Sequence, residues 1–327
     1  MTHQEPAAKN AQEIPIADQK VRHPARRWLI GAVGVALLAG VVAHVVSGDD
    51  LSSLQRLSVP VLLTTLVFQV AAQMLFNSVI FVPLRAHLPQ LNYWELFLVR
   101  TGGFFAGYVL PVAGGLAVRM AYLKRQGLTY QDFASATVLS NVTALVTIGM
   151  LTTSAVALLW ILAGPPPAAV LGLTAAVLAL AAASVFAFRW LPRVASHEWF
   201  DRWPWLATYT RYDADMGSWP RLLTLSLGRH TLNFLTFGLL YLSLSGAPRG
   251  FLAGGLVYAI TSPVRMIQIT PGNLGVNEWI VGLVGRMVSF DVAVGLLVAL
   301  VFRALGAAAQ GVGVLIATTR ISLRKRT

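Results

Sequence analysis

The chain contains several apolar runs of about 20 residues, the length that a helix needs to cross a bilayer. Backbone groups find no water partner inside lipid, so such runs are expected to pair their backbone groups internally as helices. Hydrophobic residues make up 56% of the sequence and charged residues only 12%, against about 25% charged residues in a soluble domain. The sequence therefore predicts an all-α polytopic membrane protein with no room for a sizeable soluble domain.

The apolar runs predict six full spans within one transmembrane domain at residues 28–319. Arginine and lysine residues precede the first span and follow the last one, which places both termini in the cytoplasm by the positive-inside rule. Residues 1–27 are expected to form a disordered cytoplasmic tail, and residues 320–327 a basic one. The expected spans are 28–46, 59–82, 132–162, 168–188, 222–244 and 291–318.

The formal net charge of +12 is concentrated beside the apolar runs, where cations set topology and meet anionic lipid headgroups. The longest hydrophilic stretch after the N-terminal tail, residues 189–221, mixes five of the nine tryptophans with arginines, which is typical of a loop at headgroup level. We therefore expect membrane lipids as partners and no nucleic acid. Without cysteine, and with His44 and His230 isolated from other ligand types, we expect no metal and no cofactor.

Two apolar segments are interrupted. In residues 94–122, several glycines and Pro111 prevent one continuous helix, and in residues 251–287 Pro271 and the nearby Gly272 do the same. Non-helical backbone at membrane depth is tolerated only where protein or a water-filled cavity surrounds it. Both segments are therefore predicted to form re-entrant helical hairpins.

The two interrupted segments correspond in order and approximate spacing, with Pro111 matching Pro271 and Gly115 matching Gly275. Each is flanked by one full span on either side, and the resulting units, residues 59–162 and 222–318, begin on opposite sides of the membrane. This pattern indicates an inverted repeat, in which broken helices point to a transporter's midplane site.

The second unit contains most of the intramembrane charge: Arg229, Arg265, Glu278 and Arg303. Such charges face the bundle interior or a wet cavity and have partners. Three cations against one acid leave an excess of positive charge, and arginine holds phosphate through two parallel hydrogen bonds. We expect a lipid phosphate to engage Arg229 or Arg303, while Glu278 pairs with an arginine or meets a cationic headgroup. The alternative is a Glu278–Arg303 pair that only fixes helix packing.

Four further polar residues are weaker candidates for substrate contact. Gln73 and Asn77 share one helical face, where amides also act as interhelical hydrogen-bonding groups. Arg119 lies before Lys124 and Arg125 and is also explained as a topology anchor. Asn273 is expected to cap the helix after the break.

The residues from Pro111 to Arg119, followed by Gly127, resemble the first signature of a flippase-like transmembrane family related to the lysylphosphatidylglycerol synthase membrane region. The stretch Pro271–Glu278 resembles the second signature, and Arg303 the downstream arginine. The resemblance covers roughly residues 59–318. The sequence departs from the family pattern at Leu116, Ser140, Asn141 and Ala144, where charged residues are usual, and at Asn277, where an arginine is usual.

This resemblance implies movement of a polar lipid between leaflets, with a phospholipid or an isoprenoid-linked glycolipid as substrate. A membrane enzyme acting on a lipid phosphate is an alternative, but the sequence has no paired intramembrane carboxylates, zinc signature or nucleophile elbow. A non-transporting accessory subunit of a lipid synthase is another. We expect a non-enzymatic carrier in a bacterial inner membrane, alone, as a homo-oligomer or with a lipid-synthase partner.

Overall fold

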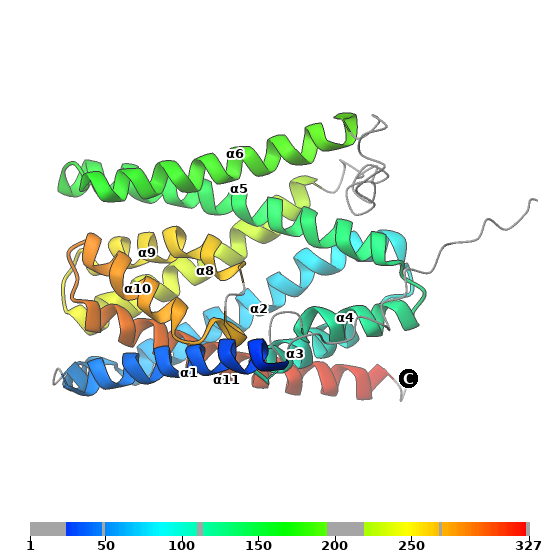
Figure 1. The fold of residues 1–327 in the computed structure, drawn as a ribbon, viewed down its shortest axis with the longest axis horizontal. Coiled ribbons are helices and arrows are strands. Elements are labelled where there is room, and N and C mark those ends of the chain that lie inside the picture. Colours follow the sequence, from blue (N-terminus) through cyan, green and yellow to red (C-terminus); the bar gives the residue numbers. More distant parts are fainter. Residues whose placement is uncertain (1–23, 48–49, 110–113, 195–218, 268–269, 325–327) are drawn as a thin grey trace, which may run out of the picture.

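The computed structural model describes residues 24–47, 50–109, 114–194, 219–267 and 270–324 (Figure 1). Within these ranges all regular secondary structure is helical, which confirms the all-α prediction. Pro111, most of the predicted loop at 189–221, residues 1–23 of the predicted N-terminal tail and residues 325–327 of the predicted C-terminal tail lie outside the described part.

A long helix occupies the position of each predicted span. Four of these helices, α2, α5, α6 and α11, are long and apolar enough to cross a membrane. The other two, α1 and α8, have 24 and 27 residues, which at about 1.5 Å per residue exceeds a hydrocarbon core of about 30 Å. The chain is a multi-pass membrane protein. The bounds of the long helices are α1 Pro24–Ser47, α2 Val59–His87, α5 Tyr130–Ala163, α6 Ala168–Val194, α8 Trp219–Ser245 and α11 Val292–Arg324.

The first interrupted segment folds back on itself as hairpin 1, made of α3 (Tyr93–Val109) and α4 (Gly114–Arg125). The two helices touch through backbone at Gly103 and Gly115, where a Cβ added to Gly103 would lie 2.7 Å from the Gly115 carbonyl oxygen. Small residues allow this approach. The first predicted hairpin is confirmed.

The second interrupted segment forms hairpin 2, made of α9 (Gly250–Arg265), a 3-10 turn η5 (Pro271–Asn273) and α10 (Val276–Met287). Three residues at the break have left-handed backbone: Gly272 at φ 58°, Asn273 at φ 53° and Gly275 at φ 77°. Glycine adopts this conformation without a steric cost, and asparagine does so more readily than most other residues. The chain therefore breaks where the sequence predicted.

Helices α2 and α8 lie side by side and antiparallel. Arg56, just before α2, donates from Nη1 to the carbonyl oxygen of Leu244 near the end of α8 at 3.3 Å. Further along, Gln69 Nε2 of α2 donates to Asn233 Oδ1 of α8 at 3.0 Å. Hairpin 1 follows α2 and hairpin 2 follows α8, so the two hairpins enter the bundle from opposite ends (Figure 1).

The helix contacts repeat between the halves as an inverted repeat requires. Helix α3 of hairpin 1 packs against α11, and α9 of hairpin 2 packs against α5. Likewise α2 packs against α11, and α8 against α5. The spacing along the chain that relates Pro111 to Pro271 also relates Pro60 to Pro220, near the starts of α2 and α8. Each hairpin is thus carried by one half and packed against the last helix of the other.

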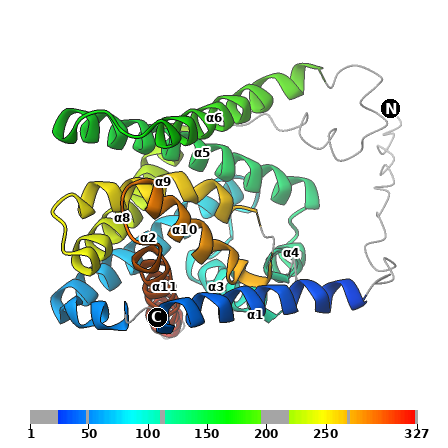
Figure 2. The ribbon, with the colours of Figure 1, turned by 60° about the vertical axis from the view of Figure 1, so that its left-hand side comes forward.

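Two helices lie outside this arrangement. Helix α6 packs mainly against α5 on one side of the bundle, and α1 lies on the opposite side (Figures 1 and 2). Helix α1 contacts α10, α11 and η5, so it touches the break of hairpin 2. The break of hairpin 2 also meets α3 of hairpin 1, which brings the two hairpins together inside the bundle.

Candidate functional site

Five buried or half-buried arginines and one fully buried acid lie on the hairpins and the helices packed between them. Glu278, on α10, is completely buried and is the one buried acid among the described residues. A charge at the centre of a membrane helix costs about 2.5–3.5 kcal/mol on insertion scales. Each arginine therefore needs partners, and a single carboxylate cannot supply all of them. The arginines are Arg100 on α3, Arg119 on α4, Arg229 on α8, Arg265 on α9 and Arg303 on α11.

Arg303 binds Glu278 and the break of hairpin 2 at the same time. Its Nε donates to Glu278 Oε1 at 2.7 Å. Its Nη1 donates to the carbonyl oxygen of Gly272 at 2.9 Å, and its Nη2 to that of Asn273 at 3.2 Å. These carbonyls lie in η5, where the helical hydrogen-bond pattern is interrupted. Arg303 therefore attaches α11 both to η5 and to the first helical turn of α10, which contains Glu278.

Arg265 is held chiefly by aromatic rings. Its guanidinium carbon lies 4.8 Å from the ring centroid of Phe237, 5.2 Å from that of Tyr258 and 5.0 Å from that of Phe302. Its Nε donates to Asn277 Oδ1 at 3.0 Å. Cation–π contact partly replaces the missing carboxylate, so Arg265 fixes the end of α9 against α8, α10 and α11.

Asn273 does not have the expected capping role. The N-cap of α10 is Gly275, which has no side chain to form a cap, and within the described residues Asn273 makes no hydrogen bond to the first backbone N–H groups of this helix. The Asn273 amide instead donates to the carbonyl oxygen of Arg265 at 3.5 Å. The left-handed backbone of Asn273 turns its side chain back towards α9, which explains why the cap prediction was wrong.

The other predicted residues belong to the first half and to α8. Arg229 places its guanidinium carbon 3.7 Å from the ring centroid of Phe76. Gln73 accepts from Arg100 Nη1 at 3.0 Å, and Arg119 Nε donates to Gly115, on its own helix, at 3.3 Å. These contacts join α2, α3 and α8, while Arg119 lies nearby on α4.

Two amide side chains of α2 form hydrogen bonds to neighbouring helices. Asn77 Nδ2 donates to the carbonyl oxygen of Tyr93 at 3.0 Å and anchors the start of hairpin 1. Gln69, on the same face, binds Asn233 of α8. Asn77 is thus engaged away from the arginines.

The arginines form two neighbouring groups. Arg265 and Arg303 surround Glu278 at hairpin 2, whereas Arg100, Arg119 and Arg229 gather at hairpin 1. Buried His230, whose Nδ1 is 2.8 Å from Tyr258 Oη, lies within electrostatic range of both Arg229 and Arg265. The second unit therefore does not hold the whole site.

Arg100 is the residue that the sequence analysis missed. It is 5% exposed and lies within electrostatic range of Arg229 and Arg119. The signal that could have found it is a lone arginine two residues before Gly102 in an otherwise apolar segment. Among the described residues, no group of three or more histidine, aspartate or glutamate side chains could hold a metal ion.

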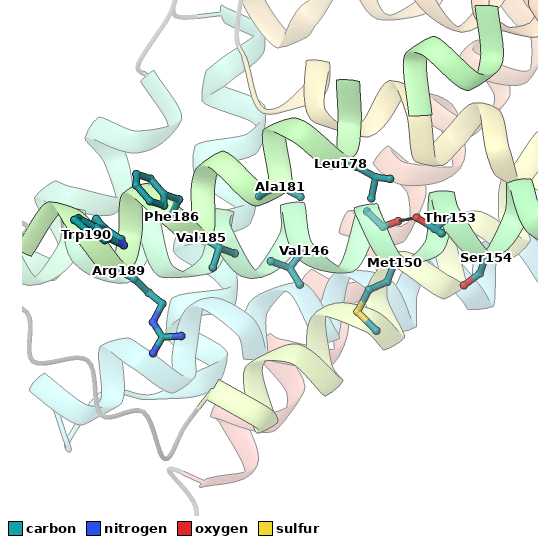
Figure 3. Close-up of a pocket in the computed structure, with 12 residues that line it drawn as sticks. Val146, Met150, Thr153, Ser154, Leu178, Ala181, Val185, Phe186, Arg189 and Trp190 are labelled. Atoms are coloured by element: carbon teal, nitrogen blue, oxygen red, sulfur yellow. Dashed lines mark hydrogen bonds between the residues drawn. The ribbon is translucent and has the colours of Figure 1, made fainter. Parts of the chain in front are cut away.

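A separate apolar groove of about 790 Å³ runs between α5 and α6 (Figure 3). Its lining includes Val146 and Met150 of α5 and Leu178 of α6, with Arg189 and Trp190 at one end. None of the buried arginines lines it. The groove is lined mainly by apolar side chains, and the arginines of the hairpins lie elsewhere.

The sequence model of the lysylphosphatidylglycerol synthase TM region matches residues 28–312. The chain belongs to this family. The match covers both hairpins and four of the long helices completely, and most of α1 and α11, and it confirms the relationship that the Pro111 and Pro271 stretches indicated. Comparisons with curated proteins and with solved structures gave no significant match. Membership links this membrane protein to lipid synthesis or handling; the inner-membrane location and the orientation of the termini remain predictions.

Proposed function

We propose that the protein is a carrier that moves a phosphate-bearing polar lipid between the two leaflets by alternating access. The observation that supports this most is the pair of broken hairpins that enter from opposite ends and meet beside a cluster of buried and half-buried arginines. Broken helices in two inverted halves are a recurrent architecture of transporter sites. The family's link to lipids narrows the cargo to a lipid.

The charge balance favours a cargo with a phosphate. Glu278 neutralises Arg303. Arg265 and Arg229 both lie against aromatic rings with no ion-pair partner among the described residues, and Arg229 makes no side-chain hydrogen bond there either. A phosphate group would supply the anion that the protein lacks, and a guanidinium binds it with two parallel hydrogen bonds.

The packing suggests how access could alternate. Hairpin 1 is carried by α2 and packs against α11, and hairpin 2 is carried by α8 and packs against α5. Rocking one half against the other would shift both hairpins at once, because each is attached to one half and rests on the other. Arg303 holds the break of hairpin 2 rigid, so hairpin 2 would move as a unit.

Reconstituted liposomes test the proposal. Full-length protein is incorporated into vesicles containing fluorescent phosphatidylglycerol, and a membrane-impermeant quencher reports how much probe reaches the outer leaflet. We expect more quenching than in protein-free vesicles, and loss of that gain with Arg229→Gln. Mass spectrometry of the same vesicles should find the probe unchanged. The same assay is run with a fluorescent isoprenoid-linked glycolipid. Quenching equal to that of protein-free vesicles for both lipids would refute transport of these cargoes. A chemically altered probe would indicate an enzyme.

A further inference from the structure

Two arginines share one aromatic ring in the first half of the bundle. The guanidinium carbon of Arg229 lies 3.7 Å from the ring centroid of Phe76, and that of Arg100 lies 4.8 Å from the same centroid. Arg100 comes from α3 of hairpin 1, Arg229 from α8 and Phe76 from α2. Three elements from both halves therefore converge on one point.

Neither cation is neutralised there. Arg229 makes no side-chain hydrogen bond among the described residues, and Arg100 leaves its buried Nε without a partner. The two hydrogen bonds that Arg100 does make both go to Gln73, one to its side-chain oxygen at 3.0 Å and one to its carbonyl oxygen at 3.2 Å. Gln73 orients Arg100 but carries no charge.

The surroundings add further positive charge. Arg119 of α4 and Arg229 both lie close enough to Arg100 to repel it, and among the described residues no carboxylate forms an ion pair with any of the three. Like charges held close together are unfavourable, and cation–π contact with Phe76, together with that of Arg100 with Phe97 at 5.1 Å, offsets only part of that cost. An anion placed against both guanidinium groups would remove the repulsion and use the free donors.

From this convergence we infer that Arg100, Arg229 and Phe76 form a binding site for a phosphate ester, separate from the Glu278–Arg303 pair, with Arg119 adding long-range attraction. Phe76 holds the two guanidinium groups on its ring. Gln73 fixes Arg100, and Arg229 is the mobile member because no hydrogen bond restrains its head. The site rests on the proposed function only in naming a lipid headgroup as the source of the phosphate.

Because Arg100 belongs to hairpin 1 and Arg229 to the long helix that carries hairpin 2, an anion bound between them would connect the two halves. Binding would then favour the arrangement in which both arginines face each other. This is the link between cargo and conformation that a carrier needs, since a ligand shifts an equilibrium only through different affinity for its two states.

Binding to the purified full chain in a non-ionic detergent tests the site. The probes are dioctanoyl-phosphatidylglycerol, dioctanoylglycerol, which has the same chains without the phosphate, and inorganic phosphate. We expect saturable, salt-sensitive binding of the phosphatidylglycerol and at least tenfold weaker binding of the diacylglycerol. Arg229→Gln should weaken phosphatidylglycerol binding by about tenfold or more, because charge-assisted hydrogen bonds are lost.

The matched control is Arg221→Gln. Arg221 lies on the same helix and is exposed, so its removal changes the net charge equally and should leave binding unchanged. Arg100→Gln should act like Arg229→Gln. Arg100→Gln loses the hydrogen bonds to Gln73, and this loss can impair folding. The deciding variant is therefore Arg229→Gln, which breaks no side-chain hydrogen bond within the described residues. Its thermal unfolding is measured alongside.

Wild-type affinity in a folded Arg229→Gln variant would overturn the site, as would equal affinity for dioctanoylglycerol and dioctanoyl-phosphatidylglycerol. Inorganic phosphate binding as tightly as phosphatidylglycerol, and weakened by Arg229→Gln, would support the site with a free anion as its ligand. Intact binding in a protein that moves no lipid in vesicles would refute the carrier function and leave the site standing.

Discussion

Replacing Arg303 with methionine removes the cation that faces Glu278 while keeping an unbranched side chain. Glu278 would remain completely buried with its charge uncompensated, since its side chain is 0% exposed and that of Arg303 is 19% exposed. Breaking a buried pair by removing one partner costs about 3–5 kcal/mol. The carbonyl groups of Gly272 and Asn273 also lose their donor. Partial exposure of Arg303 lowers the loss, so we expect Arg303→Met to reduce the free energy of unfolding by about 3 kcal/mol.

The combined variant Glu278→Gln with Arg303→Met separates the charge effect from the packing effect. It removes both charges, so it should be more stable than Arg303→Met alone although it changes one more residue. The measurement is reversible unfolding in mixed micelles, followed by circular dichroism and tryptophan fluorescence. An Arg303→Met variant that unfolds within about 1 kcal/mol of the wild type, or a double variant that loses the sum of the single losses, would refute a structural role for the pair.

Three further predictions follow from the glycine contacts and the topology. Gly103→Ala should lower the unfolding temperature, because the new Cβ would lie 2.7 Å from the backbone of α4. Gly102→Ala is the control: its Cβ would have nothing within 4 Å, so it should be neutral or stabilising by up to about 1 kcal/mol. Equal effects of the two substitutions would contradict the backbone contact. Gln126 and Arg249 are exposed residues in turns at opposite ends of the bundle. Single cysteines at these positions should react with an impermeant maleimide from opposite sides of the membrane, and the labelling is specific because the sequence has no other cysteine. Labelling of both from the same side would rule out the inverted arrangement. Gly275→Ala should lower the unfolding temperature by more than Gly103→Ala does, because the position has a φ of 77° and the new Cβ would lie 2.2 Å from a side chain of α1. A smaller decrease than that of Gly103→Ala would show that α1 moves aside.

The sequence was informative wherever a local signal sets the backbone. Apolar runs predicted the long helices, and Pro271 with its neighbouring glycines predicted the break, because each of these features determines the conformation of the backbone in its own segment. The pairing of Glu278 with an arginine could also be anticipated, since intramembrane charges need partners. The sequence also named Arg303 as that partner in one of its two alternatives. It could not show that Arg303 binds the carbonyl groups of Gly272 and Asn273 as well, because those contacts depend on how α11 packs against hairpin 2.

Arg100 and Asn273 show where sequence reasoning fails. The role of Arg100 depends on Phe76 and Arg229, which lie on two other helices, and no local pattern reports that convergence. Asn273 follows a proline and precedes a helix, which is typical of a cap, yet its positive φ directs the side chain elsewhere. Tertiary packing decided both outcomes.

Helix α1 makes the two halves unequal. It lies outside both repeats and packs against α11 and hairpin 2. Trp279 Nε1 of hairpin 2 donates to the carbonyl oxygen of Leu37 at 3.3 Å, and Gly34 faces Thr270 at the break. Among the described residues, hairpin 1 has no second copy of this helix. For the proposed carrier, two symmetric halves would give two access states of equal energy, and a helix attached to hairpin 2 but not to hairpin 1 would make those two energies unequal in the empty protein.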